Sequence, residues 1–91
     1  MSRIKIEYSS TFNRTLKKFV KNNISRYEDY SKVVRLFAKD PQHPSLNLEK
    51  LKHSPFWTIR LNRNDRIFFI WKSKTSTIFL DVGKHDKYRT Y

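Results

Sequence analysis

The stretch LEKLKHSPFWTIRLNRNDRIFFIWKSKTSTIFLDVGKHDKYRTY, residues 48–91, decides the fold of this chain of 91 residues. Three segments within it, 56–61, 66–71 and 76–82, are rich in β-branched and aromatic residues and are bounded by turn residues. This composition predicts three strands. Because the connections between the segments are short, we expect neighbouring strands to be antiparallel, as in a meander.

Side chains in the first two of these strands should alternate between two faces. The face toward the core would carry the apolar side chains at alternate positions: Trp57, Ile59, Leu61, Ile67, Phe69 and Trp71. The opposite face would carry Arg60, Arg66 and Phe68, because cross-strand partners share a face. We expect the two arginines to project toward solvent, and Phe68, if it is exposed between them, to offer a ring on which a base could stack.

The N-terminal part of the chain predicts a strand followed by a helix. Residues 3–9, RIKIEYS, alternate between apolar and polar side chains, which indicates a half-buried strand. Residues 9–23 then place apolar side chains at helical spacing and end in an Asn-Asn pair. Either Ser9 or Ser10 can cap the start of this helix.

A second helix is predicted between this segment and the strands. Ser25 and Glu28 have the spacing of a capping box and would open it, and Asp40-Pro41 would close it. The order strand, two helices and three strands predicts a single α+β domain over residues 1–91. We expect the two helices to pack on one face of a small, mostly antiparallel sheet.

The charge of the chain predicts a polyanionic partner. Lys and Arg number 20 and Asp and Glu number 8, which gives a net charge of +12. Such an excess destabilises the compact state through self-repulsion, so nucleic acid, an acidic protein or an anionic membrane surface are candidate partners. The chain has no cysteine and no H-x-x-x-H spacing, so we expect no metal site and no cofactor. Without a long apolar run or a signal-peptide core, we expect a cytoplasmic protein outside the membrane.

Residues 48–91 also carry a family resemblance. They contain an aromatic-x-I-R-L strand after an L-K pair, an arginine that starts the next strand, and VGKH with a tyrosine and an arginine close behind. In these features, and in its order of elements, the chain resembles the RelE/ParE superfamily of toxins from bacterial type II toxin–antitoxin systems. RelE-like members cleave mRNA in the ribosomal A site, ParE-like members poison DNA gyrase, and a cognate antitoxin protein neutralises both.

The resemblance implies positions for a functional site. Arg66 matches the arginine that starts the third strand in the RelE-like branch, and Arg60 matches a basic position on the preceding strand. Lys84 and His85 occupy the basic site that follows the last strand, and Glu49 resembles a glutamate that some members place before L-K. The RelE-like branch is favoured, and it would make the 70S ribosome and its mRNA partners of this chain.

The same residues fit the chemistry of RNA cleavage through the 2′-hydroxyl, which needs a base, a cation at the phosphorane and an acid, but no metal. The expected catalytic set is Glu49, Arg66, His85 and Tyr88, and the expected phosphate-binding set is Arg60, Lys84 and Arg89. Either Glu49 or His85 could be the base. The spacing after His85 leaves open whether Tyr88 or Tyr91 reaches the site.

Simpler interpretations stand beside these. Each of the proposed site residues, taken alone, is also typical of an ordinary charged surface, and Tyr88 could anchor the end of the chain in the core. A basic cluster on the first helix, Lys17, Lys18 and Lys21, is either a solvated face or a contact to ribosomal RNA. Three functions therefore compete: a ribosome-dependent mRNA endonuclease, a gyrase inhibitor, and a basic nucleic-acid-binding protein without enzymatic activity.

Overall fold

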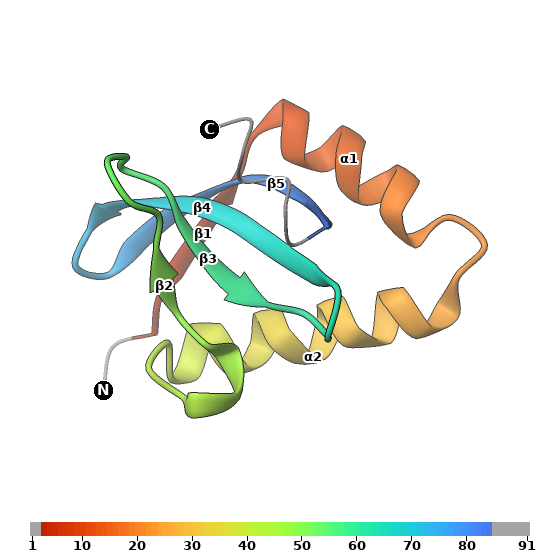
Figure 1. Cartoon of the computed structure of the whole chain (residues 1–91), viewed down its shortest axis with the longest axis horizontal. Helices are drawn as coiled ribbons and strands as arrows, with labels where there is room; N and C mark the ends of the chain where they lie inside the picture. The colour runs from red at the N-terminus through yellow and green to blue at the C-terminus, as the bar shows by residue number, and fades with distance from the viewer. Residues whose placement is uncertain (1–2, 85–91) are drawn as a thin grey trace.

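Two helices cover one face of a five-stranded sheet in the computed structural model, which describes residues 3–84 (Figure 1). The elements follow in the order β1 (Lys5–Tyr8), α1 (Ser10–Val20), α2 (Ile24–Lys39), η1 (Pro44–Leu46), β2 (Glu49–Lys50), β3 (Trp57–Arg60), β4 (Asp65–Ser73) and β5 (Ser76–Lys84). The strands are arranged as β1-β5-β4-β3-β2, with β1 parallel to β5 and all other neighbours antiparallel. The predicted α+β architecture is confirmed.

Side-chain caps fix where the two helices begin. The Ser9 Oγ accepts a hydrogen bond from the backbone N–H of Phe12 at 3.0 Å, so Ser9 is the N-cap of α1. The Asn23 Oδ1 accepts from the N–H of Arg26 at 3.0 Å and caps α2. The predicted start of the second helix at the Ser25 capping box is therefore wrong. Asn23 is an equally good cap residue, and it lies directly after the turn that ends α1.

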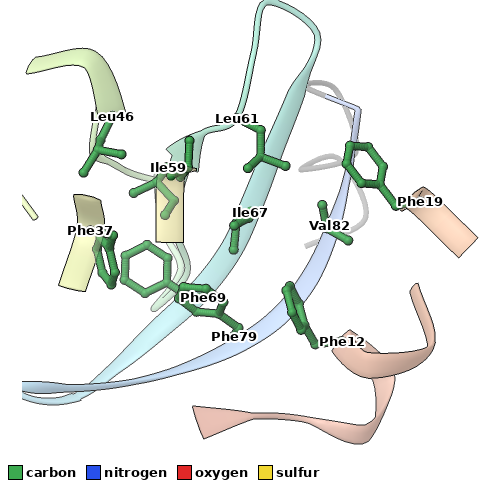
Figure 2. Close-up of a cluster of buried hydrophobic side chains, with 11 residues drawn as sticks. Phe12, Phe19, Phe37, Leu46, Ile59, Leu61, Ile67, Phe69, Phe79 and Val82 are labelled. Atoms are coloured by element: carbon green, nitrogen blue, oxygen red, sulfur yellow. The ribbon is translucent and has the colours of Figure 1, made fainter. Parts of the chain in front are cut away.

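Phenylalanine rings from both helices and the sheet make up five of the eleven buried residues of the core cluster (Figure 2). The ring centroids of Phe37 and Phe69 lie 5.2 Å apart, and those of Phe12 and Phe79 lie 5.4 Å apart. Each fully buried ring contributes on the order of 1.5–3 kcal/mol to folding. The predicted core-facing set on β3 and β4 is confirmed. Its aliphatic members and Phe69 are buried, and Trp57 and Trp71 pack against the same cluster.

The short strand β2 was not predicted from the sequence. It has two residues, and Glu49 pairs with Thr58 of β3 across the antiparallel ladder. Two charged residues carry no alternation that would indicate a strand. Its consequence for the site is direct, because the pairing with β3 brings Glu49 onto the sheet.

Candidate functional site

The face of the sheet opposite the helices carries the candidate site, and we call it the site face. Cross-strand pairing defines it, because partners in a ladder share a face. The pairs on this face are Glu49 with Thr58, Thr58 with Phe68, Arg60 with Arg66, Phe68 with Asp81, and Arg66 with Gly83. The face crosses four strands, from β2 at one edge to β5.

Arg66 is a buried cation at the centre of this face. Arg66 is 7% exposed, and its Nη1 donates to the carbonyl oxygens of Asn62 and Asp65, both at 3.3 Å. Burial lowers the pKa of Arg66, and the charge of Arg60 lowers it further, while Glu49 and Asp65 act in the opposite direction. Arginine keeps its proton in proteins at neutral pH, so Arg66 is a partly desolvated positive charge.

Arg60 is the direct cross-strand partner of Arg66 and is exposed to solvent. Like charges at directly opposed positions destabilise a sheet. The guanidinium groups match the oxygens of a phosphate in shape and charge, and an anion held between them would offset their repulsion. This pair is therefore suited to binding a phosphate group.

Glu49 is exposed on β2, one strand away from the arginine pair. Its negative charge raises the pKa of Arg66, against the lowering caused by burial and by Arg60. A carboxylate close to a bound phosphate can accept a proton from a nearby hydroxyl. The structure thus brings Glu49, Arg60 and Arg66 together on one face.

Comparisons with solved structures identify the fold. The crystal structure of YafQ from E. coli BL21(DE3) superposes with a TM-score of 0.72 over 91% of this chain and 94% of that chain, at 14% identity. The YoeB/ParE toxin from Agrobacterium tumefaciens gives 0.73 over 90% and 99%, at 14% identity. The toxin–antitoxin complex RelBE2 from Mycobacterium tuberculosis gives 0.62 over 93% and 94%, at 17% identity. No protein-family model matches the sequence, and no curated protein matches it significantly.

The chain has the fold of these toxin structures. Identities this low establish the fold and not the activity, so the role of each residue in this toxin fold rests on its own geometry. Among the described residues, 3–84, no group of three or more His, Cys, Asp or Glu side chains could hold a metal ion. No helix in the same range is long and apolar enough to cross a membrane.

Two predicted features of the site face differ in the structure. Arg66 shares a face with Arg60, as predicted, but it is buried and does not project into solvent. Phe68 is completely buried, so the exposure that a stacking ring would require is not met. Alternation along a strand gives the face on which a side chain lies, and it does not say how much of that face is covered.

Gly83 lies inside β5 and not in a turn after it. It pairs with Arg66 and does not have a positive φ angle. A residue without a Cβ leaves room beside the buried arginine. Lys84 follows it and pairs with Asp65, so by alternation its side chain starts from the helix-covered side of the sheet and not from the site face.

The remaining predicted site residues fall into two groups. His85, Tyr88 and Arg89, with the alternative Tyr91, lie outside the described residues, and their roles stay predictions. The basic cluster of Lys17, Lys18 and Lys21 is exposed on and just after α1, on the side of the sheet opposite the site face. The structure does not bring this cluster together with Arg60 and Arg66.

Two polar residues of the site region were missed from the sequence. Asp81 is buried on the site face. Simple alternation from the core residue Phe79 would instead place it on the face covered by the helices. A bulge between these two residues of β5 shifts the register and re-aims Asp81, and alternation counted from sequence cannot detect a bulge. Asn62 organises the turn beside Arg66, and its only sequence signal is an Asn-rich segment between two strands.

Proposed function

We propose that this protein is the toxin of a type II toxin–antitoxin system and that it cleaves mRNA on the ribosome. The observation that carries this proposal is the buried Arg66 directly opposite the exposed Arg60, with Glu49 on the same face. The toxin fold supports the class of protein. A net charge of +12 supports a nucleic-acid substrate.

The proposed reaction is attack of an RNA 2′-hydroxyl on the adjacent phosphate. Arg60 binds a non-bridging phosphate oxygen at the surface, and Arg66 contributes charge from beneath it as the phosphorane forms. The 2′-oxygen bonds to phosphorus, its proton passes to Glu49 or to His85, and the bond to the 5′-oxygen breaks with protonation of that oxygen. Tyr88 or Tyr91 assists at the leaving group or against a base, and Arg89 holds a flanking phosphate.

The proposed partners are a cognate antitoxin, the 70S ribosome and its mRNA. Several structures with this fold were solved as complexes, among them DinJ–YafQ from E. coli and the heterotetrameric YoeB–YefM from Staphylococcus aureus. A chain this basic suits an acidic or amphipathic antitoxin segment that covers the site face. Action on ribosomes makes the cytoplasm the expected compartment.

Induced expression in bacterial cells tests the proposal. Wild-type protein should stop the incorporation of labelled amino acids within minutes, and Arg60→Ala should relieve the arrest while the purified variant keeps the wild-type circular dichroism spectrum. A gyrase inhibitor would instead leave translation running at first and accumulate trapped gyrase–DNA cleavage complexes. Continued protein synthesis at full expression of folded toxin would contradict the proposal.

A further inference from the structure

The turn between β3 and β4 is closed by a single side chain. The Asn62 Oδ1 accepts hydrogen bonds from the backbone N–H of Asn64 at 2.9 Å and of Asp65 at 3.0 Å. The backbone N–H of Leu61 donates to the Asp65 carbonyl at 3.0 Å and completes the turn. The oxygen of the Asn62 amide thus determines the local shape of the connection between the two arginine-bearing strands.

The nitrogen of the same amide reaches a different layer of the protein. The Asn62 Nδ2 donates to the Asp29 Oδ2 at 3.2 Å, and Asp29 lies in the middle of α2, 33 residues earlier in the sequence. Both residues are only partly exposed. A hydrogen bond to a carboxylate is stronger than one between neutral groups, so this contact ties the turn to the helix layer.

The backbone of this turn holds the buried arginine. The carbonyls of Asn62 and Asp65 both accept from the Arg66 Nη1. The guanidinium is planar and rigid, so fixing one of its nitrogens against two carbonyls fixes the direction in which its other donors point. The orientation of Arg66 therefore depends on the position of the turn, and the position of the turn depends on its tie to α2.

We propose that Asn62 and Asp29 are positioning residues for Arg66. The Asp29–Asn62 hydrogen bond sets the β3–β4 turn against α2, and the turn sets the Arg66 guanidinium against Arg60 and Glu49. Neither positioning residue contacts substrate. The effect on catalysis rests on the proposed function, whereas the orientation of Arg66 is a property of the free protein.

An experiment that exchanges the amide and the carboxylate between positions 62 and 29 separates the positioning of Arg66 from simple closure of the turn. Asn62→Asp keeps an oxygen for the N–H groups of Asn64 and Asp65 but places two carboxylates face to face at the Asp29 contact. Asp29→Ala removes the acceptor altogether. The double variant Asp29→Asn/Asn62→Asp restores an amide–carboxylate hydrogen bond with the roles exchanged. Asn64→Asp, which adds the same charge at an exposed position of the same turn, is the matched control.

The first readout is mRNA cleavage on programmed 70S ribosomes under single-turnover and multiple-turnover conditions. Asn62→Asp and Asp29→Ala should lower kcat about 10- to 100-fold with little change in KM, because a catalytic group is displaced while the binding surface is kept. The double variant should recover to within a few-fold of wild type, and Asn64→Asp should be close to wild type. Equal cleavage by wild type and both single variants would overturn the proposal.

The second readout does not need activity. The Nε–H signal of Arg66 in a ¹H–¹⁵N NMR spectrum, assigned by its loss in Arg66→Lys, should shift in Asn62→Asp and Asp29→Ala and return in the double variant. An unchanged signal in both single variants would overturn the positioning role. If wild type fails to cleave but the signal behaves as expected, the proposed function fails and the positioning of Arg66 stands.

Discussion

Arg60 and Arg66 are direct cross-strand partners on β3 and β4, and the second of them is buried. Opposed like charges weaken a sheet, and burial of a charge adds to that cost. The turn carbonyls at Arg66 and the nearby carboxylates offset the cost only in part, since the pKa of Arg66 remains below its ordinary value. The arrangement is accounted for by a ligand that brings negative charge to the pair.

Inorganic phosphate should therefore stabilise the protein through this pair. At phosphate concentrations about tenfold above Kd, linkage predicts about 1.4 kcal/mol of stabilisation, which corresponds to a rise of about 6 °C or more in Tm. Arg60→Gln should lose most of this rise in a thermal melt. Arg63→Gln removes the same charge from an exposed turn position and should keep the rise, and an equal loss in both variants would point to general charge neutralisation instead.

The same substitution should improve folding while it impairs function. Without phosphate, Arg60→Gln removes the repulsion with Arg66, so urea unfolding should show a gain of about 0.2–1 kcal/mol in the free energy of unfolding. Cleavage of ribosome-bound mRNA should fall about 100-fold, as for loss of a group that stabilises transition-state charge. A less stable Arg60→Gln protein would show that the pair is not strained.

Gly83 should tolerate no side chain beside Arg66. Replacing a glycine inside a strand by valine usually stabilises, because the unfolded chain loses freedom and the strand gains a β-branched residue. Here the new side chain would compete with the buried Arg66 for space, so Gly83→Val should lower the free energy of unfolding by about 1–3 kcal/mol. Urea denaturation measures the sign of the change in the free energy of unfolding, which is sufficient for the test. A more stable variant would contradict the assigned role of Gly83.

Tyr30 of α2, which lies near Tyr8 of β1, should make the stability of the protein depend on pH. Burial raises the pKa of Tyr30 above its usual range, and the neighbouring Tyr8, through its charge and a hydrogen bond, raises it further. The folded state therefore holds the Tyr30 proton more tightly than the unfolded state, whose tyrosines titrate near pH ~10. This contribution to stability is present below about pH 10 and is lost as the pH rises above it.

Urea unfolding of wild type and Tyr30→Phe at pH 8 and pH 11 measures this effect. Wild type should lose more stability than Tyr30→Phe over this interval, because phenylalanine keeps the ring packing against Phe12, whose centroid lies 6.2 Å away, without a titrating group. Tyr27→Phe at an exposed position of α2 should keep most of the wild-type pH dependence, because the charge of Tyr27 is the smallest of the influences that raise the pKa of Tyr30. Parallel pH profiles for wild type and Tyr30→Phe would rule out the contribution of Tyr30.

Local rules account for the features of the fold that the sequence predicts correctly. Alternation in β3 and β4 assigned the core residues and the shared face of Arg60 and Arg66, because the two strands pair without interruption there. Ser9 was recognised as a possible cap because capping depends only on the next few residues. The features that the sequence did not predict depend on contacts in the assembled fold.

The features that the sequence did not predict have a common origin. The burial of Phe68 and of Arg66 depends on what covers the site face, and the direction of Asp81 depends on a bulge in β5. The Asn62–Asp29 contact joins residues that are far apart in the sequence, and no local sequence pattern predicts it. Tertiary neighbours, not local propensity, decide such features.

Cleavage of a defined mRNA on purified 70S ribosomes tests the central claim most directly. Saturating wild-type toxin should cut the message in the A site. Cleavage should persist when a metal chelator is added at a concentration that leaves the ribosomes intact. Arg66→Ala, shown to be folded by circular dichroism, should reduce the rate by about 100-fold or more. His85→Ala, compared with Glu49→Gln, should show which of the two supplies the base. Intact mRNA at saturating wild-type toxin, or equal cleavage by folded Arg66→Ala, would contradict the account.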